Sequence, residues 1–169
     1  MTHTMVEKIL ASHSEEKEAF PGQFLECEIN LVMVHEQLGG RIHEQYEKLG
    51  LEKIWDPEKV FFILDHWVPA PTISAAQMHQ DARDFAEKYK FKHNFGHHVD
   101  KGICHQVLPE LGFARPGMLI IGSDSHTTIY GAFNCLSTGV GATDVSVVFA
   151  TGKLWFRVPE TYKITLHGR

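Results

Sequence analysis

Short apolar runs alternate along this chain with segments in which apolar residues recur at helical spacing. The apolar runs at residues 60–64 and 118–121, together with residues 92–95, predict strands of a buried sheet. Residues 24–34 first alternate and then become continuously apolar, as expected of a strand that enters the sheet. One further strand is expected at residues 163–166.

Four segments between these runs predict helices, at residues 5–13, 42–49, 74–89 and 142–154. The apolar stripe of the third helix indicates a core-facing surface and consists of Ala75, Met78, Ala82, Phe85 and Ala86. Strands that alternate with helices are typical of βαβ units with right-handed crossovers. The pattern therefore predicts an α/β fold in a single domain, residues 1–169, with a mostly parallel sheet and helices on both faces.

Composition narrows the functional classes. The 169 residues are 43% hydrophobic and 22% charged, which is ordinary for a globular protein. The formal net charge of -5 argues against a protein that binds nucleic-acid backbones. The chain starts without the apolar core of a secretory signal, and no apolar stretch approaches the roughly 18 residues of a membrane span. Three cysteines without a pairing pattern suit a reducing compartment, so we expect a cytoplasmic protein without a membrane or nucleic-acid partner.

Polar side chains follow two of the predicted strands at the point where each strand ends. Asp65 and His66 follow one strand, and Asp124, Ser125 and His126 follow another. In open α/β sheets, ligands bind outside the carboxyl ends of the strands. A single Asp-His pair is more often a turn or a helix cap, but two such strand ends in one short chain indicate a ligand site.

A third imidazole, His105, lies in the segment Gly102-Ile103-Cys104-His105-Gln106. The serine at position 125 lacks the G-x-S-x-G context of a nucleophile elbow, because the residue before Asp124 is Ser123 and not a glycine. The sequence therefore argues against nucleophilic acyl transfer, and the chemistry of these groups is expected to be proton transfer.

Five motifs in a fixed order carry a resemblance to a known family. They are Asp65-His66-Trp67-Val68-Pro69, Gly102-Ile103-Cys104-His105-Gln106-Val107-Leu108-Pro109-Glu110, Gly122-Ser123-Asp124-Ser125-His126-Thr127, Gly139-Val140-Gly141-Ala142-Thr143-Asp144 and Trp155-Phe156-Arg157-Val158-Pro159-Glu160. Over residues 6–169 the chain resembles the first domain of the aconitase superfamily, and within it the large subunits of 3-isopropylmalate dehydratase and homoaconitase. The resemblance covers effectively the whole chain.

The resemblance implies a hydro-lyase that isomerises a hydroxy di- or tricarboxylic acid, of the 3-isopropylmalate, homocitrate or citrate type, by dehydration and rehydration. It also implies a four-iron four-sulfur cluster as the Lewis acid of the complete enzyme, and a small swivelling-domain subunit as a partner. Because hydroxide is a poor leaving group, such a reaction needs a metal and a general acid. Carried over by motif, the catalytic positions are Asp65, His66, His105, Asp124 and His126.

Two further positions, Ser125 and Glu36, are expected to contact the substrate. Glu36 lies in a loop at residues 32–40, where related chains usually show an aspartate at its position and a threonine at the position of Leu38. Glu36 also fits the cap of a helix that begins near Arg41. Altered substrate choice and lost activity are both compatible with these departures.

The cysteines depart from the family pattern. Cys27, Cys104 and Cys135 lack the Cys-x-x-Cys spacing that supplies two of the three cluster ligands in the family. Small buried thiols are the simpler interpretation. We therefore expect no cluster in this chain and no activity in isolation. The alternative is a non-catalytic ligand-binding or subunit-interaction module that keeps the aconitase fold.

Three remaining features have simple interpretations. The adjacent pair His97 and His98 does not match the ligand spacing of a zinc site, so no metal site is expected. Gly139 and Gly141 lack the lysine of a phosphate-binding loop, which favours close packing at a helix start. The aromatic segment at residues 155–159 is either buried within the domain or part of an exposed apolar face, in which case the chain forms a homo-oligomer.

Overall fold

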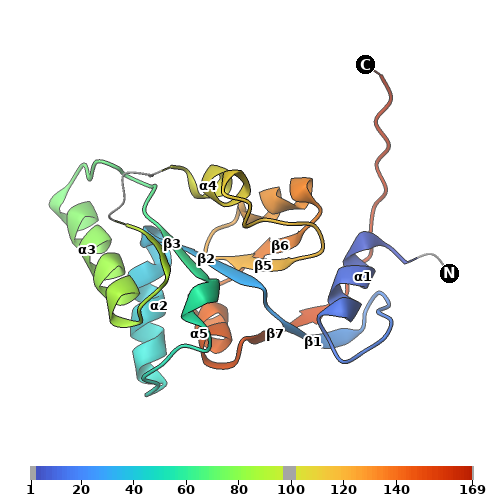
Figure 1. Cartoon of the computed structure of the whole chain (residues 1–169), viewed down its shortest axis with the longest axis horizontal. Coiled ribbons are helices and arrows are strands. Elements are labelled where there is room, and N and C mark those ends of the chain that lie inside the picture. Colours follow the sequence, from blue (N-terminus) through green and yellow to red (C-terminus); the bar gives the residue numbers. More distant parts are fainter. Residues whose placement is uncertain (1–2, 97–101, 169) are drawn as a thin grey trace.

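The structure is a computed structural model that describes residues 3–96 and 102–168. Its centre is a sheet of five strands that run parallel in the spatial order β4-β3-β2-β5-β6 (Figure 1). In chain order the strands are β2 (Leu31–His35), β3 (Val60–Ile63), β4 (His93–Phe95), β5 (Leu119–Gly122) and β6 (Leu136–Gly139). The predicted α/β fold with a mostly parallel sheet is confirmed.

Helices cover both faces of this sheet, as predicted. One face carries α2 (Glu36–Lys48), α3 (Ile73–Lys88) and α5 (Ala142–Thr151). The other face carries α4 (Cys104–Glu110) and the short 3-10 helix η2 (Thr127–Phe133). Because side chains alternate across a strand, Val32 and Val34 of β2 belong to the first core, whereas Leu31 and Met33 belong to the second.

A two-stranded antiparallel sheet pairs β1 (Phe24–Glu28) with β7 (Lys153–Arg157). The first helix, α1 (Met5–Ser12), lies near this sheet (Figure 1) and starts at a capping box formed by Thr4 and Glu7. A single 3-10 turn, η1 (Pro57–Lys59), precedes β3. In the described part of the chain, no helix is both long enough and apolar enough to cross a membrane.

Two of the strand predictions were wrong. Residues 24–34 form two strands, β1 and β2, that belong to different sheets. The chain passes between them at Asn30, whose side-chain oxygen accepts the backbone N–H of Leu119 and thereby holds the entry to β2. Residues 163–166 form no strand, and Ile164 and Leu166 are exposed, because no described strand lies beside them to share backbone hydrogen bonds.

The helix boundaries also needed correction. α5 ends at Thr151 because Gly152 adopts the left-handed conformation of a helix cap, and β7 follows at once. α2 begins at Glu36, before the predicted start at residue 42. Glycines in its first turns have low helix propensity, which is why the sequence pattern did not predict this start. A Cβ atom at Gly39 would lie only 2.9 Å from the Cβ atom of Ala82, so the glycine permits close packing of α2 on α3. α4 and β6 were not predicted.

Candidate active site

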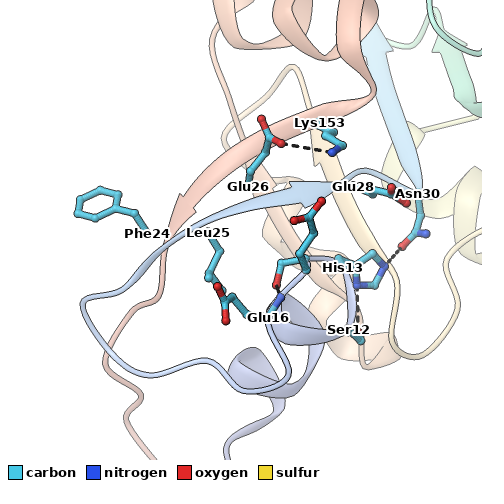
Figure 2. A pocket seen from close by; sticks show the side chains of 11 residues that line it. Ser12, His13, Glu16, Phe24, Leu25, Glu26, Glu28, Asn30 and Lys153 are labelled. Carbon is cyan, nitrogen blue, oxygen red and sulfur yellow. Dashed lines mark hydrogen bonds and ion pairs between the residues drawn. The ribbon is translucent and has the colours of Figure 1, made fainter.

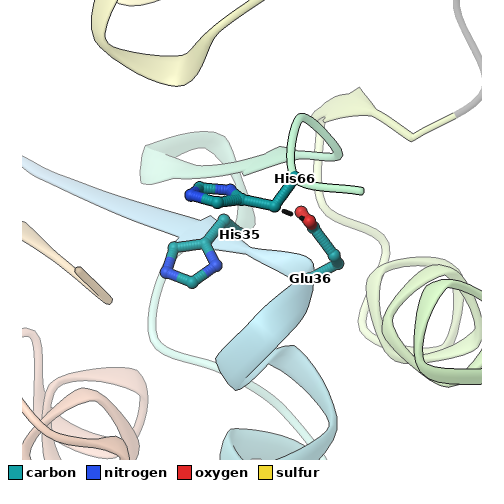
Figure 3. Close-up of side chains that lie close together, drawn as sticks. All are labelled: His35, Glu36 and His66. Carbon is teal, nitrogen blue, oxygen red and sulfur yellow. Dashed lines mark ion pairs between the residues drawn. The ribbon is translucent and has the colours of Figure 1, made fainter. Parts of the chain in front are cut away.

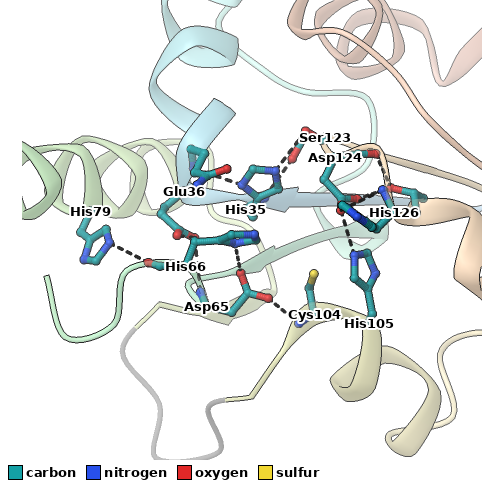
Figure 4. Close-up of polar contacts among 12 residues, drawn as sticks. His35, Glu36, Asp65, His66, His79, Cys104, His105, Ser123, Asp124 and His126 are labelled. Atoms are coloured by element: carbon teal, nitrogen blue, oxygen red, sulfur yellow. Dashed lines mark hydrogen bonds and ion pairs between the residues drawn. The ribbon is translucent and has the colours of Figure 1, made fainter. Parts of the chain in front are cut away.

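The predicted site residues meet at the carboxyl edge of the sheet. β2 pairs with β3 on one side and with β5 on the other, so the strand order reverses at β2. Such a reversal leaves a crevice in which α/β proteins bind ligands. Glu36, Asp65 and Ser123 follow the strands β2, β3 and β5 closely, and Figure 4 shows their side chains gathered at this edge. The prediction that the two Asp-His segments share one sheet edge is confirmed.

The first imidazole–carboxylate pair is Asp65 with His66. Nδ1 of His66 lies 2.5 Å from Oδ1 of Asp65, and the second oxygen, Oδ2, accepts the backbone N–H of Cys104 at 2.6 Å. The Asp65 side chain is 3% exposed and that of His66 is 37% exposed. The buried carboxylate therefore orients the ring, while the imidazole is partly exposed at this edge of the sheet.

The second pair joins His105 of α4 to Asp124 in the loop after β5. Nε2 of His105 lies 2.8 Å from Oδ2 of Asp124, and the hydroxyl of Thr127 donates to Oδ1 at 2.5 Å. The backbone N–H of His126 donates to Oδ2 at 3.1 Å. Burial opposes ionisation of Asp124, but the hydrogen bonds from His105, Thr127 and His126 outweigh it and hold the pKa of Asp124 well below its usual value. Asp124 is therefore a fixed negative charge.

Tyr130 contacts the His105 side of the second pair. Its hydroxyl donates to the backbone carbonyl of Cys104 at 3.1 Å, and Nδ1 of His105 lies 3.3 Å from the same hydroxyl. The tyrosine is fully buried, which raises the pKa of its hydroxyl and keeps it neutral. Since that hydroxyl hydrogen points to Cys104, the network is complete when His105 carries hydrogens on both ring nitrogens. The arrangement suits a proton donor.

The loop after β5 exposes Ser125 and His126. The His126 side chain is 82% exposed, and its Nδ1 atom lies 3.3 Å from the Ser125 hydroxyl and 3.5 Å from Oδ2 of Asp124. Gly139 of β6 faces this loop so closely that a Cβ atom there would collide with the Asp124 carbonyl. The close packing is thus at the end of β6, against the loop after β5, and not at the helix start where the sequence predicted it: a Cβ atom at Gly141 would lie 3.7 Å from Oδ2 of Asp144, an ordinary contact distance.

His35, like Tyr130, is a residue of this site whose role the sequence analysis missed. It ends β2, is 2% exposed, and packs its ring 4.8 Å from that of His66 (Figure 3). Its Nδ1 atom accepts the backbone N–H of Gln37, so Nε2 carries the hydrogen that is donated to the Ser123 carbonyl at 3.0 Å. Burial, and then the neighbouring His66, lower the pKa of His35 and keep it neutral. Its place directly after an apolar run was the available signal.

Glu36 does not lie where the sequence analysis expected it. Its side chain is 0% exposed and faces Asp65 and His66 (Figure 4). The contact of Glu36 with substrate therefore stays a prediction, and the side chain that would make it is buried in this structure. The reason is that Glu36 starts α2, which turns its side chain back under the strand ends.

Among the described residues, no group of side chains fits a metal ion or an iron-sulfur cluster. Ligand atoms of His35, Glu36 and His66 lie within 4.8 Å of one another, but both nitrogens of His35 are already used in hydrogen bonds to the backbone. The three cysteines are buried, and Cys27 belongs to a different core from Cys104 and Cys135. Burial raises the pKa of all three thiols, that of Cys27 to about 11, so they are poor cluster ligands. The pair His97 and His98 lies outside the described residues.

A separate hollow between α1 and β1 is unsuited to an acidic substrate (Figure 2). Its lining includes the carboxylates of Glu15, Glu16, Glu26 and Glu28, and its lysine, Lys153, already pairs with Glu26. None of the residues predicted to be catalytic lines it. The carboxyl edge of the parallel sheet is therefore the better candidate.

Comparison with known proteins agrees with this assignment of the fold. Residues 7–169 match the model of the aconitase family (aconitate hydratase). The chain is 46% identical over 168 residues to "3-isopropylmalate dehydratase large subunit 1" of Methanopyrus kandleri, covering 99% of this chain and 40% of that protein. It is 42% identical over 169 residues to the 3-isopropylmalate dehydratase large subunit of Hydrogenobaculum sp., covering 100% of this chain and 39% of that protein. The chain thus spans about 40% of the length of these curated relatives, and it belongs to the aconitase family.

Proposed function

We propose that this chain supplies proton-transfer residues to a hydro-lyase active site, and that this site dehydrates and rehydrates a hydroxy di- or tricarboxylic acid. The observation that carries the proposal is the convergence of two imidazole–carboxylate pairs, Asp65 with His66 and His105 with Asp124, at one strand-order reversal. Membership of the aconitase family and the names of the relatives support this reaction class. The acid is of the 3-isopropylmalate type by the same argument.

Removal of water requires that a hydroxyl group receives a proton as its bond to carbon breaks. His66 is suited to deliver it, because Nδ1 is held by Asp65 and its ring edge reaches the crevice. His105, with Asp124 as a fixed anion, is the second proton-handling group. His126 and Ser125 are exposed beside them and contact the substrate oxygens.

The cluster of the complete enzyme, as the family implies it, supplies Lewis-acid chemistry on the substrate hydroxyl. Its ligands come from outside this chain, since the buried thiols here do not fit the role. We further propose that the chain folds as one domain, works in the cytoplasm beside cluster-bearing and small-subunit partners, and binds neither nucleic acid nor membrane. Its relatives are named as large subunits, which supports a small-subunit partner.

A chimera tests the catalytic proposal. This chain replaces the matching 168 residues of the Methanopyrus kandleri relative, and the purified holoenzyme is assayed with 3-isopropylmalate, citrate and homocitrate. We expect an active enzyme in which His66→Asn and His105→Asn each lower kcat by about 100-fold or more, the scale of a lost general acid. His167→Asn, an exposed histidine remote from the site, is the matched control.

The second candidate function is a non-catalytic ligand-binding or interaction module. The observation that favours it is the lack of fitting cluster ligands in a chain that spans about 40% of its relatives. An inactive but folded chimera that still binds the hydroxy acid supports this alternative. An active chimera that tolerates both histidine substitutions contradicts the proposed roles of His66 and His105.

A further inference from the structure

Glu36 connects two strand ends beneath the candidate active site. It starts α2 directly after β2, and its Oε2 atom accepts the backbone N–H of Asp65, which follows β3, at 3.2 Å. The carboxylate thus holds the segment that carries the first imidazole–carboxylate pair. Figure 3 shows it between the backbone of α2 and the ring of His66.

The other oxygen of Glu36 has no hydrogen-bond partner. Oε1 is buried and has no hydrogen-bond partner, and Nδ1 of His66 lies 3.7 Å from it. A buried carboxylate oxygen without a partner destabilises the folded protein, so its retention needs a reason. Burial raises the pKa of Glu36, whereas the hydrogen bond from Asp65 and the neighbouring His66 ring oppose that rise. The carboxylate of Glu36 and the ring of His66 therefore interact electrostatically.

We propose that Glu36 is a positioning residue for the Asp65–His66 pair: Oε2 fixes the Asp65 backbone, and Oε1 gives Nδ1 of His66 a second carboxylate to face. With Asp65 and Glu36 on the same side of the ring, a hydrogen stays on Nδ1. Nε2 is then the nitrogen that takes up and releases a proton toward a ligand. This inference rests on the proposed function of His66 as a proton donor.

Two other histidines lie close to His66, but their contacts do not suit them to position its ring. The ring of His35, from β2, lies 4.8 Å away but is neutral and already bonded through both nitrogens. His79, from α3, contacts the backbone carbonyl of His66, at 3.1 Å, and not its ring. Within the described residues, the acidic side chains that contact the ring of His66 are those of Asp65 and Glu36, both at Nδ1.

Nuclear magnetic resonance of the whole chain with ¹⁵N-labelled histidine tests the inference without any turnover. In the unaltered chain we expect neutral His66 to carry its hydrogen on Nδ1. Glu36→Gln keeps an oxygen for the Asp65 N–H but removes the charge. It should move the pH midpoint of the His66 ring signals lower by about half a unit or more, and raise the share of the Nε2–H form. Glu36→Asp keeps the charge and should restore most of the original midpoint.

Glu44→Gln is the matched control, since Glu44 lies on the same helix but is 66% exposed and pairs with Lys48. It should leave the His66 signals unchanged. If Glu36→Gln does not fold, two measurements still test the inference. They are the tautomer of neutral His66 in the unaltered chain and the pH midpoint of the His66 ring signals in Glu36→Asp. Neutral His66 with its hydrogen on Nε2, or a folded Glu36→Gln chain with an unchanged midpoint and tautomer, overturns the inference. Loss of activity in the chimera with these signals intact would instead count against the proposed function.

Discussion

Nε2 of His105 lies 2.8 Å from Oδ2 of Asp124, which ties the first turn of α4 to the loop after β5. The contact holds α4 against this loop at the edge where the ligand crevice is expected. A hydroxyl and a backbone N–H also donate to the Asp124 carboxylate.

Acid should weaken the fold through Asp124. Its pKa in the folded chain is lowered, so its stabilising effect is complete above the unfolded value of about 3.9 and is lost as the pH falls below that value. Urea unfolding at a series of pH values should show the unaltered chain losing more stability than Asp124→Asn between about pH 5 and pH 3. Parallel curves for the two proteins would refute the contribution of Asp124.

Glu36 should act in the opposite direction. Its pKa is raised in the folded chain, so its contribution is fully present below the unfolded value of about 4.3 and is lost as the pH rises through the folded value. The stability of Glu36→Gln relative to the unaltered chain should therefore increase from about pH 4 upward. Thermal unfolding across this range measures the difference, and Glu44→Gln should show no comparable trend.

The hydroxyl of Thr127 should matter for stability. It is fully buried and donates to Oδ1 of Asp124 at 2.5 Å, so Thr127→Val leaves a buried carboxylate oxygen short of one donor. We expect a loss of about 1–3 kcal/mol in the free energy of unfolding. The neighbouring Thr128 is exposed, and Thr128→Val should change the unfolding free energy by less than about 0.5 kcal/mol. Equal effects of the two substitutions would contradict the assigned hydrogen bond.

The purified chain should be colourless and its thiols slow to react. Cys27, Cys104 and Cys135 are buried, and burial raises the pKa of each thiol. A thiol reagent at pH 8 should label all three cysteines quickly in urea and only slowly under native conditions. Brown absorption that tracks with bound iron, after anaerobic reconstitution of the chain alone, would show that these thiols hold a cluster after all.

Self-association should depend on the outer face of the β1–β7 sheet. Phe24 and Trp155 are 65% and 63% exposed, and their rings lie 5.7 Å apart across the two strands. Exposed paired aromatics of this kind favour association with another apolar surface. Light scattering at tens of micromolar should show a concentration-dependent species that Trp155→Arg reduces. A monomer at all concentrations would end this idea.

The sequence by itself determined which segments meet at the candidate active site. Apolar runs before Asp65 and Asp124 marked buried strands, and the carboxyl ends of parallel strands share one edge, so these residues could be expected to meet. The stripe on α3 was likewise readable, because Ala82, Phe85 and Ala86 recur at helical spacing and are buried.

Only the tertiary structure decided how these groups are held. The reversal of strand order at β2 depends on backbone pairing between distant segments, which no local pattern records. That pairing buries His35 and Glu36 under the strand ends, although their neighbourhood in the sequence resembles an exposed loop. Residues 163–166 show the converse, because an alternating pattern becomes a strand only when another strand supplies its hydrogen bonds.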